Sequence, residues 1–219
     1  RRRRAVEASE RETQAMLLKA FQRVIDGAPL RPMAEVAPLV RRPVEVEPDK
    51  TYMELGVRSF GRGTFHKPGL SGMEVGSKKL FTIEFGDLVF NIVFAWEGAV
   101  AIAKPEDDGR VGSHRFLTCV TNPDQVAAEF LLFYFRTTEG LQKLGEASPG
   151  GAGRNRTLGL KKLEVIEVPV PPIETQHWFS RLQAKAQEIR SIRMRTTEDV
   201  DALMPALLHE VFRSEASAA

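Results

Sequence analysis

The spacing of apolar positions divides the chain into three zones, of which the first predicts a helix. Five apolar residues recur at helical spacing near its end, namely Leu17, Ala20, Phe21, Val24 and Ile25. Gly27 follows at the position where glycine commonly ends a helix. Four prolines come next and predict an extended connector that no continuous helix can occupy: Pro29, Pro32, Pro38 and Pro43.

The middle zone, roughly residues 45–170, reads as a mixture of strands and helices. Short apolar runs bounded by turn residues predict strands at 52–58, 80–83, 88–94, 99–103 and 115–120. Turn residues at 85–87 and 107–109 separate some of these runs. A helix is expected to start at 122–124, and the glycine-rich stretch 148–153 predicts a loop. Alternation over 163–170 predicts a last strand, which the prolines at 171–172 end.

The third zone is helical, with apolar residues at multiples of three and four positions. Its first run contains Trp178, Leu182, Ile189 and Ile192, and its second runs from Val200 to Phe212. We expect a break at 196–199 and a kink or new turn at Pro205, and hence more than one helix. The segment 16–21 resembles the segment 207–212, which fits either a repeat or two unrelated amphipathic helix ends.

Composition narrows the class of protein. With 219 residues, 42% hydrophobic and 27% charged, the chain is long and apolar enough for an ordinary core, so wholesale disorder is excluded. Cys119 is the single cysteine, which excludes a disulfide scaffold and fits a cytoplasmic location. The apolar stretch 88–103 contains Asn91 and Glu97 and is too short and too polar to span a membrane. No signal peptide is visible, and the lack of an initiator Met suggests an excised or incomplete chain.

The net charge of +2 hides an uneven distribution. Residues 58–79 carry five basic residues against one acidic residue, Glu74, and the stretches 110–120 and 148–162 are basic without any acid. Residues 198–215 are the opposite, with five acids and only Arg213. Basic, glycine-rich loops suit a phosphate backbone, although solvated loops are also often charged without binding anything.

Catalytic and metal-binding patterns are absent from the sequence. The four histidines are scattered, so no metal site is expected, and Cys119 lies in an apolar run that suggests a buried strand cysteine. Three polar stretches remain as candidates for binding. Residues 55–63 present Arg58 and Arg62 in a glycine-rich turn, residues 83–91 present Asn91, and residues 151–158 present Arg154, Asn155 and Arg156. Each also fits a plain structural role, as an unliganded hairpin, a strand residue bonded to backbone, or a solvated loop.

These stretches bring the chain close to a known family. It resembles the DNA specificity subunit of type I restriction–modification systems. The resemblance covers about residues 29–208 and depends on an ordered set of motifs: Tyr52-x-x-Leu55-Gly56-Val57-Arg58-Ser59, Gly86-Asp87-Leu88, Trp96-Glu97-Gly98-Ala99, Ser113-His114-Arg115-Phe116, Ser148-Pro149-Gly150, Arg154-Asn155-Arg156-Thr157-Leu158 and Val168-Pro169-Val170-Pro171-Pro172-x-x-x-Gln176.

The resemblance implies an α+β fold. A mixed α/β target recognition domain with a largely β core would occupy residues 29–172. Residues 1–28 would be the end of a spacer helix, and residues 173–215 would form the C-terminal spacer or dimerisation helices of an antiparallel, coiled-coil-like pair. The family carries two recognition domains and this chain one, so it would be half of a longer subunit or a half-length subunit that forms a homodimer.

The implied function is recognition of double-stranded DNA at a split site, without catalysis by this chain. The expected partners are methyltransferase (modification) subunits and a restriction subunit, and S-adenosylmethionine, ATP and Mg²⁺ would be bound by those partners and not here. The resemblance does not identify which residues contact DNA, and the candidates follow from their charge and hydrogen-bonding groups: Arg58, Ser59, Arg62, Lys67, Lys78, Lys79, Asn91, His114, Arg115, Arg154, Asn155 and Arg156. The subunit-interface candidates are Trp178, Leu182, Ile189, Leu203, Leu207 and Phe212.

Two other classes of function stay open at this point. The rival is a helical assembly module whose α/β domain binds protein and never reads DNA, which a salt-sensitive DNA footprint would separate from the specificity subunit. An enzyme is the third class, and methylation or cleavage by the purified chain alone would support it.

Overall fold

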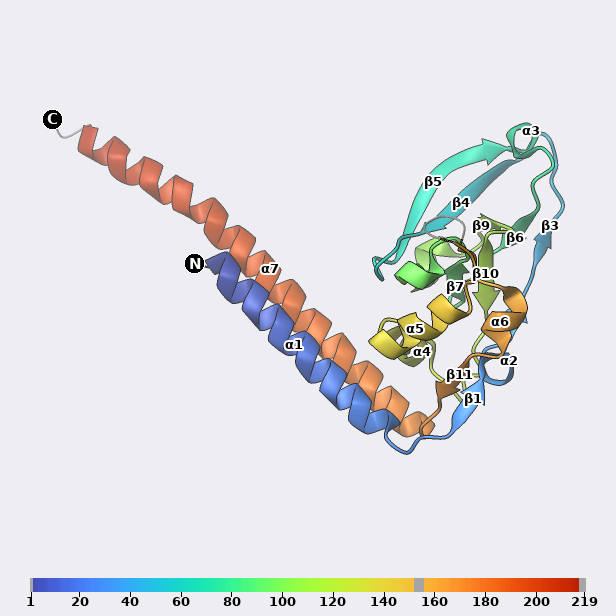
Figure 1. The fold of residues 1–219 in the computed structure, drawn as a ribbon. Helices are drawn as coiled ribbons and strands as arrows, with labels where there is room; N and C mark the ends of the chain where they lie inside the picture. The colour runs from blue at the N-terminus through green and yellow to red at the C-terminus, as the bar shows by residue number, and fades with distance from the viewer. Residues whose placement is uncertain (1, 152–155, 217–219) are drawn as a thin grey trace. The chain divides into compact units, whose positions relative to one another are not determined.

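The computed structural model describes residues 2–151 and 156–216, which form two compact units (Figure 1). One unit consists of Arg1–Arg23 with Trp178–Ala219, and the other of Val24–His177. The first is helical, and the second contains the sheets and the remaining helices. The mixed helix and sheet architecture agrees with the α+β fold expected from the sequence.

The helical unit is an antiparallel pair. It is built from α1 (Arg2–Ile25) and the long helix α7 (Ile173–Ala216). The rings of Phe21 and Phe179 are 5.1 Å apart between centroids, Glu10 Oε1 lies 3.0 Å from Arg190 Nε, and Arg193 donates a hydrogen bond to Ser9. Residue numbers fall along α1 as they rise along α7, so the two helices run in opposite directions.

The predicted break at 196–199 is wrong, because α7 is one continuous helix of 44 residues, and Pro205 does not start a separate helix. Thr196 does not cap a new helix: its hydroxyl donates to the carbonyl of Ile192 four residues earlier, a bond that keeps threonine inside a helix. None of the described helices combines the length and the apolar character that a membrane span needs.

The described residues of the second unit form three sheets. The smallest pairs β1 (Leu30–Pro32) with β11 (Glu167–Pro169) in antiparallel register. The four-stranded sheet has the order β2 (Leu39–Val40), β10 (Phe116–Cys119), β7 (Leu88–Asn91), β8 (Val100–Ile102). The five-stranded sheet has the order β3 (Pro43–Val44), β6 (Leu80–Thr82), β9 (Val111–Ser113), β4 (Thr51–Val57), β5 (Thr64–Ser71).

The five strands expected in this zone correspond to β4, β6, β7, β8 and β10, most of them shorter than predicted. Two further strands of this zone, β5 and β9, were not predicted. Strand β5 contains Pro68 and Gly69, which argue against a strand in the sequence. It lies at the edge of its sheet, where a missing backbone N–H is tolerated, and its register with β4 shifts between Met53 and Leu55.

Two predictions of local structure are corrected. The strand expected over 163–170 starts as helix α6 (Leu160–Glu164), and only its second half forms β11. The helix expected from 122–124 begins later, as α4 (Ala128–Tyr134), because Asn122 closes a turn with its side chain on the N–H of Asp124. The connector after residue 29 also contains the short helix α2 (Met33–Val36).

The core of this unit lies between the sheets and the helices α4 and α5 (Thr138–Glu146). The rings of Phe90 and Phe135 meet edge to face at 5.3 Å between centroids, which packs the end of α4 against β7. Gln176 is fully buried, and its Oε1 accepts the N–H of Ala127 at 3.0 Å. It thereby supplies a hydrogen-bond acceptor to a backbone N–H at the start of α4. Short turns η1 (Ala95–Glu97), η2 (Pro105–Asp107) and helix α3 (Gly72–Val75) complete the unit.

Candidate nucleic-acid interface

The turn between β4 and β5, residues 58–63, carries the first group of predicted site residues. The N–H of Arg58 donates to the carbonyl of Gly63 at 3.0 Å and closes the turn. Three positions of this turn have positive φ: Phe60 with +60°, Gly61 with +63° and Gly63 with +79°. Glycine adopts this backbone without a steric penalty, whereas phenylalanine does not.

Hydrogen bonds hold this turn against η1. The N–H of Phe60 donates to the carbonyl of Glu97 at 2.8 Å, and the N–H of Gly61 donates to that of Gly98 at 3.0 Å. The hydroxyl of Ser59 donates to the carboxylate of Glu97 at 2.9 Å, so this predicted site residue is engaged in positioning the turn. These bonds therefore fix the chain at Phe60 and at the residues directly before and after it.

Arg136 fixes the turn from the other side. It follows α4, and its Nη2 donates to the carbonyl of Gly61 at 2.8 Å. A Cβ at Gly61 would lie 2.6 Å from Arg136 Nε, so the close approach needs glycine. Partial burial lowers the pKa of Arg136, and the guanidinium stays protonated at neutral pH.

Arg58 and Arg62 are exposed on this turn. Arg58 Nη1 donates to the carbonyl of Thr64 at 2.8 Å, and its guanidinium lies 4.6 Å from the centre of the Phe65 ring. The guanidinium of Arg62 lies 5.8 Å from the centre of the Phe60 ring. Within the described residues neither arginine forms an ion pair with a carboxylate. Both charges are therefore available to an anionic ligand.

Arg156 is used inside the protein. It donates to the carbonyl of Gly145 at 2.8 Å and to that of Ser148 at 3.3 Å, at the C-terminal end of α5, where a cation is favourable. Its guanidinium also lies 5.0 Å from the centre of the Trp96 ring in η1. These contacts favour a structural role. The neighbouring candidates Arg154 and Asn155 lie outside the described residues.

A second group surrounds the turn between β9 and β10. His114 and Arg115 are exposed there, and the pairing of Leu80 with Ser113 places Lys79 opposite His114. Lys78 and Lys79 are also exposed, and none of these four forms an ion pair within the described part of the chain. Lys79, just before β6, and His114, just after β9, thus lie at the same end of these paired strands, next to Lys78 and Arg115 in the sequence.

Two predicted residues have partners that reduce their availability. Lys67 on β5 lies 3.9 Å from the carboxylate of Glu54 and 5.5 Å from the centre of the Phe116 ring. Asn91, at the end of β7, accepts the N–H of Val93 on its side-chain oxygen at 3.2 Å. That contact matches the structural alternative for Asn91 more closely than a base contact.

The two groups are joined through the segment after β7. The N–H of Ile92 donates to the carbonyl of Arg115 at 2.9 Å, and the N–H of Leu158 donates to that of Ile92 at 2.9 Å. Residues 92–98 then lead directly to η1 and to the β4–β5 turn. Backbone hydrogen bonds thus connect the segment after Asn91 to Arg115 and Leu158, and this segment continues into η1, which holds the turn that carries Arg58 and Arg62.

Sequence reasoning missed three residues of this surface. Arg41 donates to the carbonyl of Phe116 at 2.9 Å and lies 4.3 Å from the centre of the Phe81 ring, which places a further cation by the β9–β10 turn. Arg136 comes from a helix end far away in sequence and offers no local pattern. Phe60 does offer one, because a large aromatic residue stands beside glycine in a tight turn.

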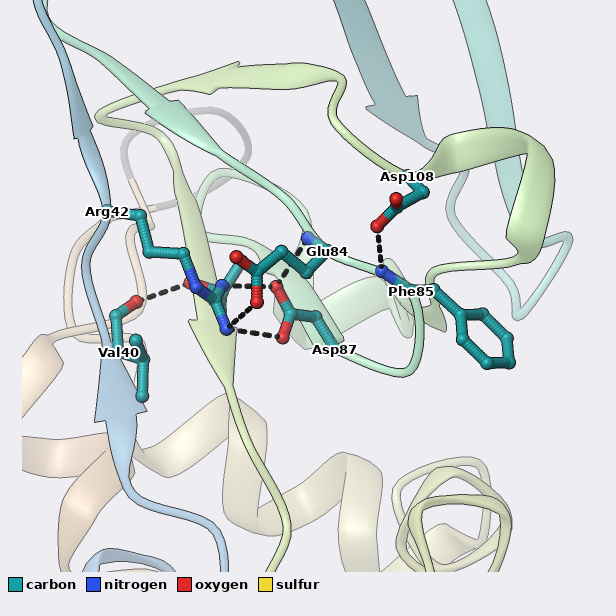
Figure 2. A network of polar contacts seen from close by, with 7 residues as sticks. Val40, Arg42, Glu84, Phe85, Asp87 and Asp108 are labelled. Carbon is teal, nitrogen blue, oxygen red and sulfur yellow. Dashed lines mark hydrogen bonds and ion pairs between the residues drawn. The ribbon is translucent and has the colours of Figure 1, made fainter.

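An ion pair with a buried carboxylate joins the segments that link the two larger sheets (Figure 2). Arg42 donates to both carboxylate oxygens of Asp87, at 2.7 and 3.2 Å, and lies 3.0 Å from the carboxylate of Glu84. The carboxylate of Asp87 is 3% exposed and also accepts the N–H of Glu84 at 2.9 Å. The Gly86-Asp87-Leu88 motif therefore carries a structural pair in this chain.

A second buried carboxylate ties β5 to η2. Asp107 accepts hydrogen bonds from the hydroxyl of Thr64, the Nε2 of His66 and the N–H of Lys104, at 2.8, 2.8 and 2.9 Å. Burial raises the pKa of Asp107, but these hydrogen bonds and the charge of His66 outweigh it and hold the pKa below its ordinary value. The partner of Thr64 is thus an ionised group that fixes the start of β5.

The predicted subunit-interface residues lie on α7. Trp178, Ile189 and Leu203 are 48%, 43% and 57% exposed, whereas Leu182 is half-buried. The side chains of Leu207 and Phe212 lie outside those that the structure describes. The residue of α7 that packs on Phe21 is Phe179, which the sequence analysis did not single out. An apolar strip of α7 thus stays uncovered in this chain.

Clusters of metal ligands do not occur in the described ranges: no three His, Cys, Asp or Glu side chains gather at one place there. Cys119 is buried in β10, as the sequence predicted, and burial raises the pKa of its thiol to about 12.

No protein-family model and no curated protein matches the sequence. Solved structures do match the fold. The HsdS subunit from Thermoanaerobacter tengcongensis superposes with a TM-score of 0.61 and 19% identity, over 81% of this chain and 47% of that one. A chain from a structure describing complex assembly and conformational transition of the type I R-M system gives 0.61 and 20%, over 84% and 49%. The chain spans about half of the length of these structures. It has, over that half, the fold of the HsdS specificity subunits of type I restriction–modification systems.

Proposed function

We propose that this chain is part of a DNA specificity subunit and that its α/β unit binds duplex DNA and reads sequence there. The observation that carries the proposal is the set of exposed cations on the β4–β5 and β9–β10 turns, of which Arg58, Arg62 and Arg115 have no carboxylate partner among the described residues. Cations left without a carboxylate partner are suited to phosphates, and arginine also suits the edge of guanine. The similarity of the fold to HsdS subunits supports the same proposal.

The candidates divide by the contacts that they already make. We propose that Arg58 and Arg62 contact base edges or phosphates. The proposed phosphate contacts are Lys78, Lys79, His114 and Arg115. Ser59, Asn91 and Arg156 position the surface through hydrogen bonds inside the protein. Arg154 and Asn155 stay proposed contacts on sequence grounds alone.

The test is a selection from a pool of random-sequence duplexes, because the target sequence is unknown. An enriched motif, bound more tightly than the starting pool and with an affinity that falls steeply with salt, supports the proposal. Binding without any enriched sequence would contradict sequence reading. A chain that binds no duplex at low salt would contradict DNA binding altogether.

A matched pair of variants sharpens this test. Arg62→Ala removes an exposed cation of the β4–β5 turn, and Arg31→Ala removes an exposed cation that is paired with Glu35 at 2.7 Å. Arg62→Ala should weaken binding, and should lower the slope of log affinity against log salt by about 1 if Arg62 contacts a phosphate. Arg31→Ala should leave both unchanged.

We also propose that α7 is an assembly surface for methyltransferase subunits or for a second copy of the helical unit, and that the chain itself is not catalytic. Trp178, Ile189 and Leu203 would lie in that contact, since their apolar side chains are partly exposed. Light scattering tests the second copy: a mass near twice 24.4 kDa supports self-assembly. A constant mass near 24.4 kDa at all concentrations would contradict it and leave the methyltransferase as the proposed partner.

A further inference from the structure

The β4–β5 turn holds a large aromatic side chain in an unusual state. The Phe60 side chain is 71% exposed, and among the described residues it is the one non-glycine with positive φ. A bulky residue in the left-handed region is strained, and such strain persists where the surroundings impose it, most often at functional sites. Because the ring is exposed, the strain is not compensated by packing in the core.

Hydrogen bonds fix the backbone of the turn while the Phe60 ring stays exposed. The backbone N–H groups of Phe60 and Gly61 are both bound to carbonyls beside η1, at 2.8 and 3.0 Å. Arg136 holds the carbonyl of Gly61, and Ser59 is bonded to Glu97. An aromatic residue fixed in this way loses little conformational freedom when it meets a ligand, because its backbone is already ordered.

The charges around the ring indicate what that ligand is. Arg58 and Arg62 flank Phe60 in the sequence, and Arg62 lies 5.8 Å from the centre of its ring. The nearby carboxylate of Glu97 is bonded to Ser59. An exposed ring with one cation beside it and a second cation in the same turn suits a nucleic-acid duplex, in which phosphates flank every base step and an inserted ring can unstack that step.

We infer that Phe60 is a wedge residue that inserts between two base pairs of bound duplex DNA, with Arg58 and Arg62 on the phosphates beside that step. The inference rests on the proposed function, since it needs the α/β unit to bind DNA, and it adds a contact that unstacks the duplex at one position. Stacking of a base on an aromatic side chain is sequence-tolerant, so the wedge contributes to affinity and to DNA bending more than to base identity.

Phe85 offers a matched control. It is also a phenylalanine in a turn, 63% exposed, and its ring points away from the Arg42–Asp87 pair (Figure 2). Its surroundings are acidic: Glu84 and Asp87 are neighbours in sequence, and Asp108 accepts its N–H at 2.8 Å. A phosphate backbone is repelled there, so Phe85→Ala removes the same amount of aromatic surface outside the proposed contact.

The test uses the full chain and the duplex enriched by selection, with 2-aminopurine placed at each position in turn. Wild-type protein should raise the fluorescence at one step, because unstacking removes the quenching by neighbouring bases. Phe60→Ala should lose that signal and bind about 5- to 150-fold more weakly. Phe60→Trp should restore both, and Phe85→Ala should change neither. The salt dependence of Phe60→Ala should match that of wild type, since the ring contacts no phosphate.

Phe60→Gly separates the wedge from folding. Glycine adopts a φ of +60° without strain, so this variant should unfold at a higher urea concentration than wild type and still bind more weakly. A more stable protein with weaker binding cannot be explained by misfolding. Wild-type affinity and an unchanged fluorescence pattern in Phe60→Ala and Phe60→Gly would overturn the wedge alone. A wild-type chain that binds no duplex would overturn the wedge and the proposed function together.

Discussion

Arg42 donates two hydrogen bonds to the buried carboxylate of Asp87, and this pair joins two sheets. Arg42 lies in the link from β2 to β3, and Asp87 in the link from β6 to β7 (Figure 2). In each link the chain passes between the four-stranded and the five-stranded sheet. The pair therefore fastens two crossings of the chain at one point.

Removing Arg42 should be costly. Arg42→Met leaves the carboxylate of Asp87 buried without its cation, and such changes destabilise proteins by about 3–5 kcal/mol. Glu84→Gln is the control, because Glu84 is 54% exposed and exposed pairs contribute about 0–1 kcal/mol. Urea unfolding measures both. Equal losses in the two variants would mean that burial of Asp87 does not determine the strength of this contact.

Asp107 should make the fold acid-sensitive. Because its pKa is lowered in the folded state, folding is favoured by its ionised form, and that contribution is complete above the ordinary aspartate pKa of about 3.9. It is lost as the pH falls from there through the lower folded pKa. In Asp107→Asn the free energy of unfolding should therefore fall less steeply below pH 4 than in wild type.

A second variant tests the cause of this acid sensitivity. Thr64→Val removes one hydrogen bond to the Asp107 carboxylate and leaves the carboxylate itself in place. Its unfolding curve against pH should lie between those of wild type and Asp107→Asn. A slope unchanged from wild type in both variants would assign the acid sensitivity to other carboxylates.

Two glycines should respond differently to alanine. A Cβ at Gly140 would lie 2.1 Å from the backbone carbonyl oxygen of Tyr134, whereas a Cβ at Gly56 would lie 2.3 Å from the ring of Phe65. The backbone cannot move without disturbing the junction of α4 and α5, but the ring can turn aside. Gly140→Ala should destabilise by about 1–3 kcal/mol, as overpacking does, and Gly56→Ala by less. Thermal unfolding of both gives the order, and the reverse order would contradict this reading.

Cys119 should be inert in the folded protein. Burial, together with the charges of Asp87 and Glu164, raises the pKa of its thiol to about 12, so almost no thiolate exists near pH 8. A disulfide reagent should react with no thiol in native protein and with one thiol per chain in urea, since Cys119 is the single cysteine. Rapid labelling without denaturant would show that β10 opens under native conditions.

Much of the fold was predictable because the strands carry local patterns. The runs at β4, β7 and β10 are apolar and bounded by turn residues, and they form strands in the structure. Strand β5 was missed because Pro68 marks an edge strand only when its neighbours are known. The break at 196–199 was predicted from a run of polar residues. It is wrong because Thr196 makes a hydrogen bond to the helix backbone, which a polar run in the sequence does not reveal.

The site was less predictable, because it depends on partners distant in sequence. Arg58 and Arg62 were found from their local turn, and both are exposed. Arg156 looked alike in the sequence, yet it is bound to Gly145 and Ser148, which no local pattern reveals. The strain at Phe60 is likewise invisible without backbone angles, although the aromatic residue beside glycine was visible.

The pairing of β1 with β11 has a consequence for how such a chain can change. Leu30 lies opposite Pro169 and Pro32 opposite Glu167, so the α/β unit starts and finishes side by side. A segment whose two ends meet behaves as an insert: it can be exchanged for another with the same pair of ends while the flanking helices keep their sequence. Recombination at these two short strands would then replace the whole proposed DNA-binding surface in one event, as a cassette.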